Sequence, residues 1–301
     1  MTSATTAPDS PDPERSDGPA RAVTPGLHLI ATPIGAARDI TLRALDLLAG
    51  ADVLAAEDTR SLRRLMELHG ISVGRRPLLA YHDHNGPRMR PRLLSELAAG
   101  RTVVYASEAG TPLVADPGYQ LVREAVAAGH AVHAAPGPSA VLTALVVSGL
   151  PSDRFAFMGF APTRKGERER ALRAAAAIPA TLIFYESPRR VHELLANMVQ
   201  VFGTARDAAL CRELTKRHEE VLRMPLGELV DHLKGRDLRG EVVLVVDRAR
   251  TEGSDPAAID AALVTALART SLKDAVAEVA ATTGAPRRIV YQAALRLQGE
   301  T

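Results

Sequence analysis

The stretch Ser107-Glu108-Ala109-Gly110-Thr111-Pro112-Leu113-Val114-Ala115-Asp116-Pro117-Gly118 connects an apolar run, residues 102–106, to a helical pattern that begins at Tyr119. It holds two glycines, two prolines, two small hydroxyl residues and two carboxylates. A strand-to-helix connection usually has roughly 2 to 6 residues, so this one is unusually long. Its composition is typical of a loop that wraps a small molecule with main-chain groups.

On both sides of this loop, short apolar runs alternate with segments of helical period. The alternation predicts an α/β fold class with an open, largely parallel sheet covered by helices. The predicted strands are residues 27–31, 53–56, 78–81, 102–106 and 131–134, and the predicted helices are residues 40–50, 60–70, 91–100, 119–129 and 139–149.

A domain boundary is predicted at Gly149-Leu150-Pro151, where glycine can end a helix and proline cannot continue it. Beyond it, predicted strands at 154–160, 181–185, 208–213 and 241–247 indicate a second α/β domain. The predicted organisation is a disordered tail at 1–25, domains at 26–150 and 151–250, and a small helical appendage at 255–301 with helices at 272–281 and 287–297.

The composition of the 301 residues limits the class of protein. No apolar run approaches the roughly 18 residues of a membrane helix, and the N-terminus lacks the basic and apolar regions of a secretory signal. Cys211 is the one cysteine and cannot form an internal disulfide, and no Cys and His spacing resembles a zinc site. We therefore expect a soluble cytoplasmic protein with no metal site and no membrane partner.

Basic residues are concentrated in two segments, although the formal net charge is only +2. Residues 60–92 contain eight arginines against two acidic residues, and residues 154–173 contain six basic residues against two acidic ones. Both segments lie near predicted ligand loops. Their charge is consistent with a polyanionic partner.

Two further turns follow predicted strands of the first domain. Ala31-Thr32-Pro33-Ile34-Gly35 comes after the first strand and lacks the Gly-x-Gly-x-x-Gly spacing, which counts against a nicotinamide cofactor. Pro136-Gly137-Pro138-Ser139-Ala140 comes after the fifth strand, where Ser139 can cap a helix or bond a ligand. In a parallel sheet these turns and the 107–118 loop emerge at the carboxyl ends of strands, so we expect one shared pocket.

These turns belong to an ordered series of blocks that continues into the second half of the chain. The series resembles that of the bacterial 16S rRNA cytidine 2'-O-ribose methyltransferases of the tetrapyrrole-methylase superfamily, over about residues 27–248. One departure is Glu108, where the family usually has Asp. The blocks include Ala56-Glu57-Asp58-Thr59-Arg60, Tyr81-His82-Asp83-His84-Asn85, Gly159-Phe160, Tyr185-Glu186-Ser187-Pro188-Arg189-Arg190, Cys211-Arg212-Glu213-Leu214-Thr215-Lys216 and Arg239-Gly240-Glu241.

The resemblance implies a two-domain tetrapyrrole-methylase-like fold, with the cofactor cleft between the domains, and a homodimer. It implies S-adenosylmethionine-dependent 2'-O-methylation of a cytidine ribose, cytidine 1402 by the family's name, in the 16S rRNA of the 30S subunit. By matching position, the implied S-adenosylmethionine contacts are Pro33, Ile34, Gly35, Glu108, Ala109, Gly110, Thr111, Pro112, Pro138, Ser139 and Ala140 in the first domain, and Leu214, Thr215 and Gly240 in the second.

Methyl transfer to a ribose hydroxyl benefits from a group that removes its proton or stabilises the developing alkoxide. Glu213 and Lys216, at the end of a predicted strand, are the candidate catalytic residues. An ion-paired structural cluster explains these residues nearly as well. The predicted substrate contacts are Arg60, Glu186, Arg189 and Arg212, with RNA phosphate as the partner of the arginines.

Other functions stay open from the residues alone. The His82-Asp83-His84 block has too few ligands for a metal site. The last two predicted helices can form a helix-turn-helix-like element that presents Arg287 and Arg288 to nucleic acid, or they can serve packing or dimerisation. A tetrapyrrole-precursor methyltransferase of the same fold and a non-catalytic RNA-binding protein are the alternatives. The basic segments and the blocks at 57–60 and 212–216 favour RNA over a tetrapyrrole.

Overall fold

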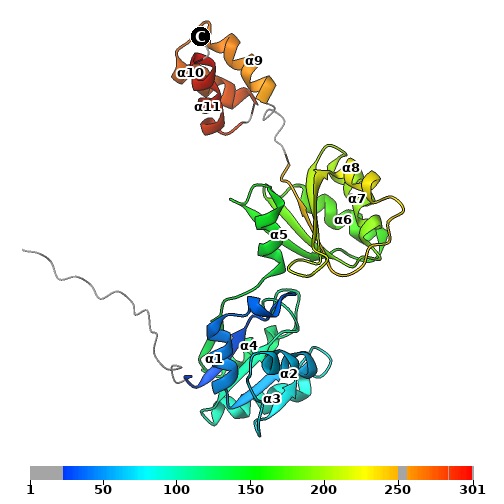
Figure 1. Cartoon of the computed structure of the whole chain (residues 1–301). Helices are drawn as coiled ribbons and strands as arrows, with labels where there is room; N and C mark the ends of the chain where they lie inside the picture. The colour runs from blue at the N-terminus through cyan, green and yellow to red at the C-terminus, as the bar shows by residue number, and fades with distance from the viewer. Residues whose placement is uncertain (1–22, 250–255, 284, 300–301) are drawn as a thin grey trace, which may run out of the picture. The chain divides into compact units, whose positions relative to one another are not determined.

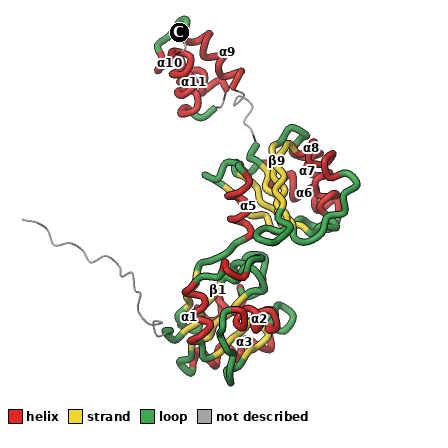
Figure 2. Tube along the Cα trace, viewed as in Figure 1, coloured by secondary structure: helices red, strands yellow, loops and turns green. Residues whose placement is uncertain are grey.

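The computed structural model describes residues 23–249, 256–283 and 285–299, so most of the predicted tail at 1–25 lies outside the described residues. The chain divides into two compact units, residues 1–140 and 141–301. Each unit contains its own sheet (Figures 1 and 2).

The division falls at the start of helix α5 (Ala140–Ser148), earlier in the chain than the boundary predicted at residue 150. Helix α5 is hydrogen-bonded to strands of the second unit. The carbonyl of Ala144 accepts a hydrogen bond from the Cys211 thiol, and the carbonyl of Val147 accepts two from the Arg223 guanidinium. These bonds explain why α5 groups with the second unit although it follows the last strand of the first.

The first unit contains a five-stranded parallel sheet in the order β3-β2-β4-β1-β5. The predicted strands lie within one residue of those observed, because each is a short apolar run. The inner strands β1, β2 and β4 are buried or nearly so on both faces, whereas the edge strands β3 and β5 are partly exposed. Its elements are β1 (Gly26–Ile30), the short helix η1 (Ala37–Asp39), α1 (Leu42–Gly50), β2 (Val53–Ala56), α2 (Thr59–Leu68), β3 (Leu78–Ala80), α3 (Gly86–Ala98), β4 (Thr102–Ala106), α4 (Tyr119–Ala127) and β5 (Val132–Ala135).

Helices cover both faces of this sheet, and each face has its own apolar core. Leu48 of α1 and Met66 of α2 pack with Leu54 and Val104 of the strands. On the other face, Leu93 and Leu97 of α3 and Leu121 of α4 pack with Val103 and Tyr105. Burial of the sheet on both faces leaves its carboxyl edge, where the loops emerge, as the place for a ligand.

The second unit contains a mixed five-stranded sheet in the order β6-β7-β10-β8-β9. Only β6 and β7 are parallel, and β9 is a strand that the sequence pattern did not predict. The strand β9 is only partly buried, so it lacks the continuous apolar run of the others. The elements are β6 (Phe155–Phe160), α6 (Lys165–Ala176), β7 (Thr181–Glu186), α7 (Val191–Phe202), β8 (Asp207–Arg212), β9 (Glu220–Pro225), α8 (Leu226–Leu233) and β10 (Val242–Val246).

Helices α6, α7 and α8 pack on one face of the second sheet, and α5 lies on the other (Figure 1). The predicted helical appendage consists of α9 (Pro256–Leu267), α10 (Leu272–Thr283) and α11 (Arg287–Gly299), with an apolar core of its own around Leu263 and Val290. Among the described residues, no helix is both long enough and apolar enough to cross a membrane.

Candidate functional site

Two loops of the first unit are joined by backbone pairing at the carboxyl edge of the sheet. The N–H of Thr32 donates to the carbonyl of Gly110, and the N–H of Gly110 donates to the carbonyl of Thr32, each at 2.9 Å between N and O. The Thr32 hydroxyl also donates to the carbonyl of Ser107, at 3.3 Å. The loops that follow β1 and β4 therefore form one structure.

The third predicted turn is attached to the same structure. The Thr111 hydroxyl donates to the carbonyl of Pro138, at 2.9 Å, and the Ser107 hydroxyl donates to the carbonyl of Gly110 at the same distance. Gly110 has φ of 79°, and a Cβ there would lie 3.3 Å from Cγ2 of Ile34. The structure thus brings together the three loops that contain the predicted cofactor contacts of the first domain.

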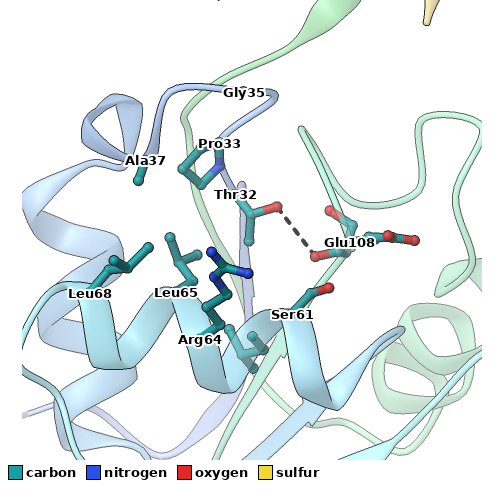
Figure 3. A pocket seen from close by; sticks show the side chains of 11 residues that line it. Thr32, Pro33, Gly35, Ala37, Ser61, Arg64, Leu65, Leu68 and Glu108 are labelled. Atoms are coloured by element: carbon teal, nitrogen blue, oxygen red, sulfur yellow. Dashed lines mark hydrogen bonds between the residues drawn. The ribbon is translucent and has the colours of Figure 1, made fainter. Parts of the chain in front are cut away.

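A pocket of about 210 Å³ lies against the loops that follow β1 and β4 (Figure 3). Thr32, Pro33, Gly35, Ser107 and Glu108 form one side of it. Helix α2 supplies the other side, and Figure 3 shows its side chains rising toward the loops. The pocket-lining residues of α2 that the sequence analysis missed are Ser61, Leu62, Arg64, Leu65 and Leu68.

The sequence feature that could have predicted these pocket residues is the N-terminal cap of α2. Asp58 caps the helix, because its carboxylate accepts hydrogen bonds from the N–H of Arg60 and the hydroxyl of Ser61. Leu62 and Met66 are buried on the inner face of the helix. The helical period then places Ser61, Leu65 and Leu68 beside one another at the pocket, with Arg64 as the basic residue.

The 107–118 loop is held in a strained shape from below. Leu113 and Ala115 have φ of 71° and 62°, values that side-chain-bearing residues rarely adopt. The Tyr105 hydroxyl, beneath the loop, donates to the carbonyl of Pro117 at 3.0 Å. A Cβ on Gly118, which has φ of 125°, would lie 2.9 Å from the Tyr105 ring. Glycine is therefore required where the loop passes over Tyr105.

Carboxyl groups surround the base of this loop. Burial raises the pKa of Glu57, and the charges of Glu108 and Asp83 raise it further. A hydrogen bond from the N–H of Glu108 lowers this pKa, but it does not cancel the increase. Burial and the Glu57 charge raise the pKa of Asp116 to about 7, despite a hydrogen bond with Ser107. Because these carboxyl groups disfavour one another's charge, a cationic ligand beside the loop would favour their ionised forms.

The candidate residues of the second unit lie at one end of its sheet. Val242 pairs with Glu186 of β7 on one side and with Arg212 of β8 on the other. The ends of β7 and β8 and the start of β10 therefore meet, which brings the block at 212–216 next to Gly240. The side chain of Leu214 is buried, and the N–H of Thr215 donates to the Glu219 carboxylate at 2.6 Å.

Lys216 is held between two carboxylates at this end of the sheet. Its ammonium lies 2.9 Å from Oε1 of Glu213 and 3.1 Å from Oε2 of Glu241. Burial opposes the charged form, but hydrogen bonds to Glu213 and Glu241 outweigh it and raise the pKa of Lys216. Burial would likewise raise the pKa of Glu213, but hydrogen bonds from Lys216 and the Glu241 N–H lower it. Lys216 is a cation and Glu213 an anion at neutral pH.

The predicted RNA contacts differ in how accessible they are. The Arg60 side chain is 93% exposed, and Arg189 is also exposed. Arg212 is largely buried and bonds to Glu220 at 3.0 Å and to the carbonyl of Arg239. Glu186 is buried, with its carboxylate 2.5 Å from the Arg190 guanidinium and bonded to the Ser187 N–H. In this structure Glu186 holds Arg190 rather than facing solvent.

The His82 and His84 rings lie 6.0 Å apart, edge to face. Within the described parts of the chain, no group of three or more His, Cys, Asp or Glu side chains is arranged to hold a metal ion.

The family model for tetrapyrrole (corrin/porphyrin) methylases matches residues 26–230, which include both sheets except β10. The chain belongs to this methylase family. A second model, the RsmI C-terminal HTH domain, matches residues 253–298.

Curated members are similar over nearly their whole length. The chain is 48% identical to a ribosomal RNA small subunit methyltransferase I of Mesorhizobium japonicum, over 93% of this chain and 95% of the relative. It is 43% identical to the Escherichia coli O157:H7 protein of the same name, over 91% of this chain and 96% of the relative. The chain is therefore a member of the family of ribosomal RNA small subunit methyltransferase I proteins.

A solved methylase structure shares the fold. Uroporphyrin-III C-methyl transferase from Thermus thermophilus, complexed with S-adenosyl homocysteine, superposes with a TM-score of 0.53 at 20% identity. The match covers 74% of this chain and 97% of the Thermus chain.

The pH dependence of stability tests the raised pKa of Asp116. Its folded-state pKa, about 7, is above the ordinary 3.8, so the folded chain binds more protons between these values and stability falls as pH rises through that window. We expect Asp116→Asn to have a higher Tm than the parent at pH 8 and the same Tm near pH 4, measured by thermal unfolding.

Asp153→Asn is the control, because a hydrogen bond from Arg248 lowers the pKa of the Asp153 carboxyl. The substitution has the opposite effect: Asp153→Asn should be less stable than the parent at neutral pH, and this difference should disappear in acid. Parallel pH profiles for Asp116→Asn and the parent would contradict the burial of a titrating Asp116.

Gly240 tests the packing around Lys216. Gly240 has φ of 86°, and a Cβ there would lie 2.2 Å from Oε1 of Glu213. Gly235 has a similar φ of 76° with no atom within 4 Å of its Cβ position. Each alanine costs about 1–2 kcal/mol of backbone strain, and only Gly240→Ala also displaces Glu213. Denaturant unfolding should show a larger loss for Gly240→Ala than for Gly235→Ala, and equal losses would exclude the clash.

Proposed function

We propose that the chain is an enzyme that transfers a methyl group from S-adenosylmethionine to the 2'-hydroxyl of a cytidine ribose in 16S ribosomal RNA. The observation that carries this proposal is the similarity to ribosomal RNA small subunit methyltransferase I proteins, 43–48% identical over more than nine-tenths of both chains. Cytidine 1402 as the target, a homodimer and a cytoplasmic location complete the proposal, and they rest on the family resemblance.

The pocket of the first unit fits such a cofactor in its chemistry. The loops after β1 and β4 line it at Pro33, Gly35, Ser107 and Glu108. Hydrogen bonds join these two loops to each other and to Pro138 of the third loop. S-adenosylmethionine supplies, when bound, a methyl group on a cationic sulfonium that is a good leaving group. Glu108 lines the pocket and interacts electrostatically with Glu57 and Asp116, which favours a cationic group beside Glu108.

Arg64 complements these carboxyl groups, since it is the basic residue lining the pocket and suits the carboxylate of an amino-acid ligand. The second unit offers Leu214, Thr215 and Gly240 as further cofactor contacts, which we carry over from the family resemblance. Because the side chain of Leu214 is buried, main-chain groups are the atoms available to a ligand at that residue.

The charge states of Lys216 and Glu213 give these two catalytic candidates different roles. The raised pKa of Lys216 keeps its side chain as an ammonium, which cannot accept a proton but can stabilise a developing alkoxide. Glu213 has a lowered pKa and is engaged by Lys216 and the Glu241 N–H, so it is a weak base. We therefore assign the 2'-hydroxyl to Lys216, with Glu213 as the residue that positions it, and the hydroxyl proton passes to solvent water as the carbon–oxygen bond forms.

The exposed guanidinium groups of Arg60 and Arg189 are the phosphate contacts in this proposal. Arg212 is fixed by Glu220 and the Arg239 carbonyl, so it contributes a preorganised charge. A methyltransferase for a tetrapyrrole precursor is the competing function within the fold. The solved Thermus enzyme of that kind is 20% identical to this chain, well below the rRNA methyltransferases.

The function is tested by incubating the purified chain with S-adenosylmethionine labelled in the methyl group and 30S subunits from a strain that lacks the enzyme. We expect label in 16S rRNA, at the 2'-oxygen of one cytidine when the modified nucleotide is mapped. Cofactor binding with label only in an added porphyrin or corrin precursor would favour a methyltransferase for a tetrapyrrole precursor. RNA binding with neither cofactor binding nor transfer would favour a non-catalytic protein.

The role of Lys216 is tested by comparing Lys216→Met, Lys216→Arg and Glu213→Gln in the same assay. Loss of one preorganised cation at a developing negative charge lowers kcat by about 100-fold or more, so we expect that loss for Lys216→Met. Lys216→Arg should retain part of the rate, and Glu213→Gln should fall between the two. Cofactor affinity, measured by calorimetry, should stay unchanged.

Lys234→Met is the matched control, since Lys234 is an exposed lysine at the end of α8. Full turnover by folded Lys216→Met would remove Lys216 from catalysis and leave the ion-paired structural cluster as its role.

A further inference from the structure

Three aromatic rings cluster on the second sheet, in a chain that has only five Phe, five Tyr and no Trp. The rings of Phe157 and Tyr185 lie 4.8 Å apart between centroids, and those of Phe160 and Tyr185 lie 5.6 Å apart. Both pairs meet at 66°. The sequence singled out Gly159-Phe160, but the proposed chemistry gives that block no role.

A β-bulge creates this cluster. Phe157 and Phe160 are three residues apart, so in a regular strand their side chains would point to opposite faces of the sheet. The register between β6 and β7 shifts between these two residues, which pair with Ile183 and Tyr185 respectively. Gly159, inside the shift, has φ of 66°. The bulge turns Phe160 to the face of Phe157 and Tyr185, the re-aiming of a side chain that bulges perform beside functional sites.

The cluster is exposed at its outer end. Phe160 is 55% exposed, although it is a large apolar side chain at the last position of β6. Ala156 and Met158, which alternate with Phe157 on β6, pack instead against the core beneath α6 and α7. The cluster therefore faces away from that core.

Positive charge lies at the same end of the sheet. The chain leaves β7 directly after Tyr185 and Glu186 and presents Arg189, which is exposed. Arg212, at the end of β8, and Lys216, which follows it, lie near this end of β7 through the register at Val242, but both are ion-paired with glutamates. An apolar protein partner would have to bury the Arg189 guanidinium, whereas an unpaired nucleotide supplies both a base for the ring and a phosphate for Arg189.

We propose that Phe160, supported by Tyr185, is a stacking platform for an unpaired nucleobase of the substrate RNA. The inference rests on the proposed function and extends it, since it names the residue that binds an unpaired nucleotide of the substrate. Stacking between a base and an aromatic ring needs only an exposed ring face, which Phe160 offers. The exposed Arg189 then acts on the backbone of the same strand.

The absence of tryptophan from the chain permits a direct test. Phe160→Trp introduces a sole tryptophan at the platform, and Phe155→Trp introduces one at the other end of β6, where Phe155 is 43% exposed. Both full-length variants are titrated with 30S subunits that lack the methyl group, and with oligocytidylate as a minimal single strand. We expect quenching of the Phe160→Trp emission by both probes and a constant emission from Phe155→Trp. Constant emission from Phe160→Trp, or equal quenching of both variants, would overturn the proposal.

Alanine variants supply the energetic test. Loss of one stacking ring weakens binding by about 5- to 150-fold, so we expect Phe160→Ala to raise KM for the unmethylated subunits by that factor with cofactor affinity unchanged. Phe155→Ala is the control and should leave KM unchanged. Because Phe160 is exposed, the Tm of Phe160→Ala should match the parent.

The failures of the two proposals are distinguishable. If the parent chain places no label in rRNA, the proposed function fails. If the parent methylates rRNA and Phe160→Ala has the parent's KM, only the stacking platform fails. If Phe160→Ala and Phe155→Ala both dissociate a dimer without affecting RNA affinity, the aromatic cluster serves contact between copies, and the stacking platform is wrong.

Discussion

The two backbone hydrogen bonds between Thr32 and Gly110 are the constraint on which the candidate site depends. Strands β1 and β4 run parallel, yet Thr32 and Gly110, just beyond their carboxyl ends, pair antiparallel. The chain after β4 must therefore reverse between Ser107 and Gly110. This reversal requires the positive φ of Gly110 and brings the hydroxyls of Ser107 and Thr111 to the carbonyls they bond. One pairing thus fixes the shape of three loops.

Backbone strain is concentrated in the two candidate regions. Among the described residues, the non-glycine positions with positive φ are Leu113, Ala115, Glu213 and Thr215. Two lie in the loop after β4, and two lie in the segment after β8. Strain of this kind costs of order 1–3 kcal/mol per residue and persists where surrounding contacts enforce it. Here those contacts are the Tyr105 bond to Pro117 in the first unit and the Lys216 and Glu241 bonds to Glu213 in the second. Specific hydrogen bonds therefore hold both strained regions.

The sequence predicted the first sheet and the grouping of its loops because both follow from local pattern and from the geometry of parallel strands. Buried runs such as Val53 to Ala56 have one interpretation, and the carboxyl ends of parallel strands share one edge. Strand β9 was missed because a half-buried edge strand needs no continuous apolar run. The burial of Glu186 against Arg190 could not be predicted, since it depends on how the residues after β7 fold back. The bulge at Gly159 likewise depends on a partner strand more than 20 residues away in sequence.

Charge counted along the sequence overstates the charge available to RNA. In the segment 60–92, the Arg76 guanidinium bonds to carbonyls at the end of α1, and Arg90 is paired with Glu124. In the segment 154–173, Arg168 is buried against Asn197 and Glu193. These arginines hold the fold, so they cannot form the phosphate contacts that their number suggests. The other basic side chains of these segments, among them Arg63, Arg64 and Arg88, are exposed and can contact phosphate. Phosphate contacts carry no sequence information, so an enzyme that must find one ribose on a folded ribosomal RNA must add contacts to bases and to the shape of the RNA.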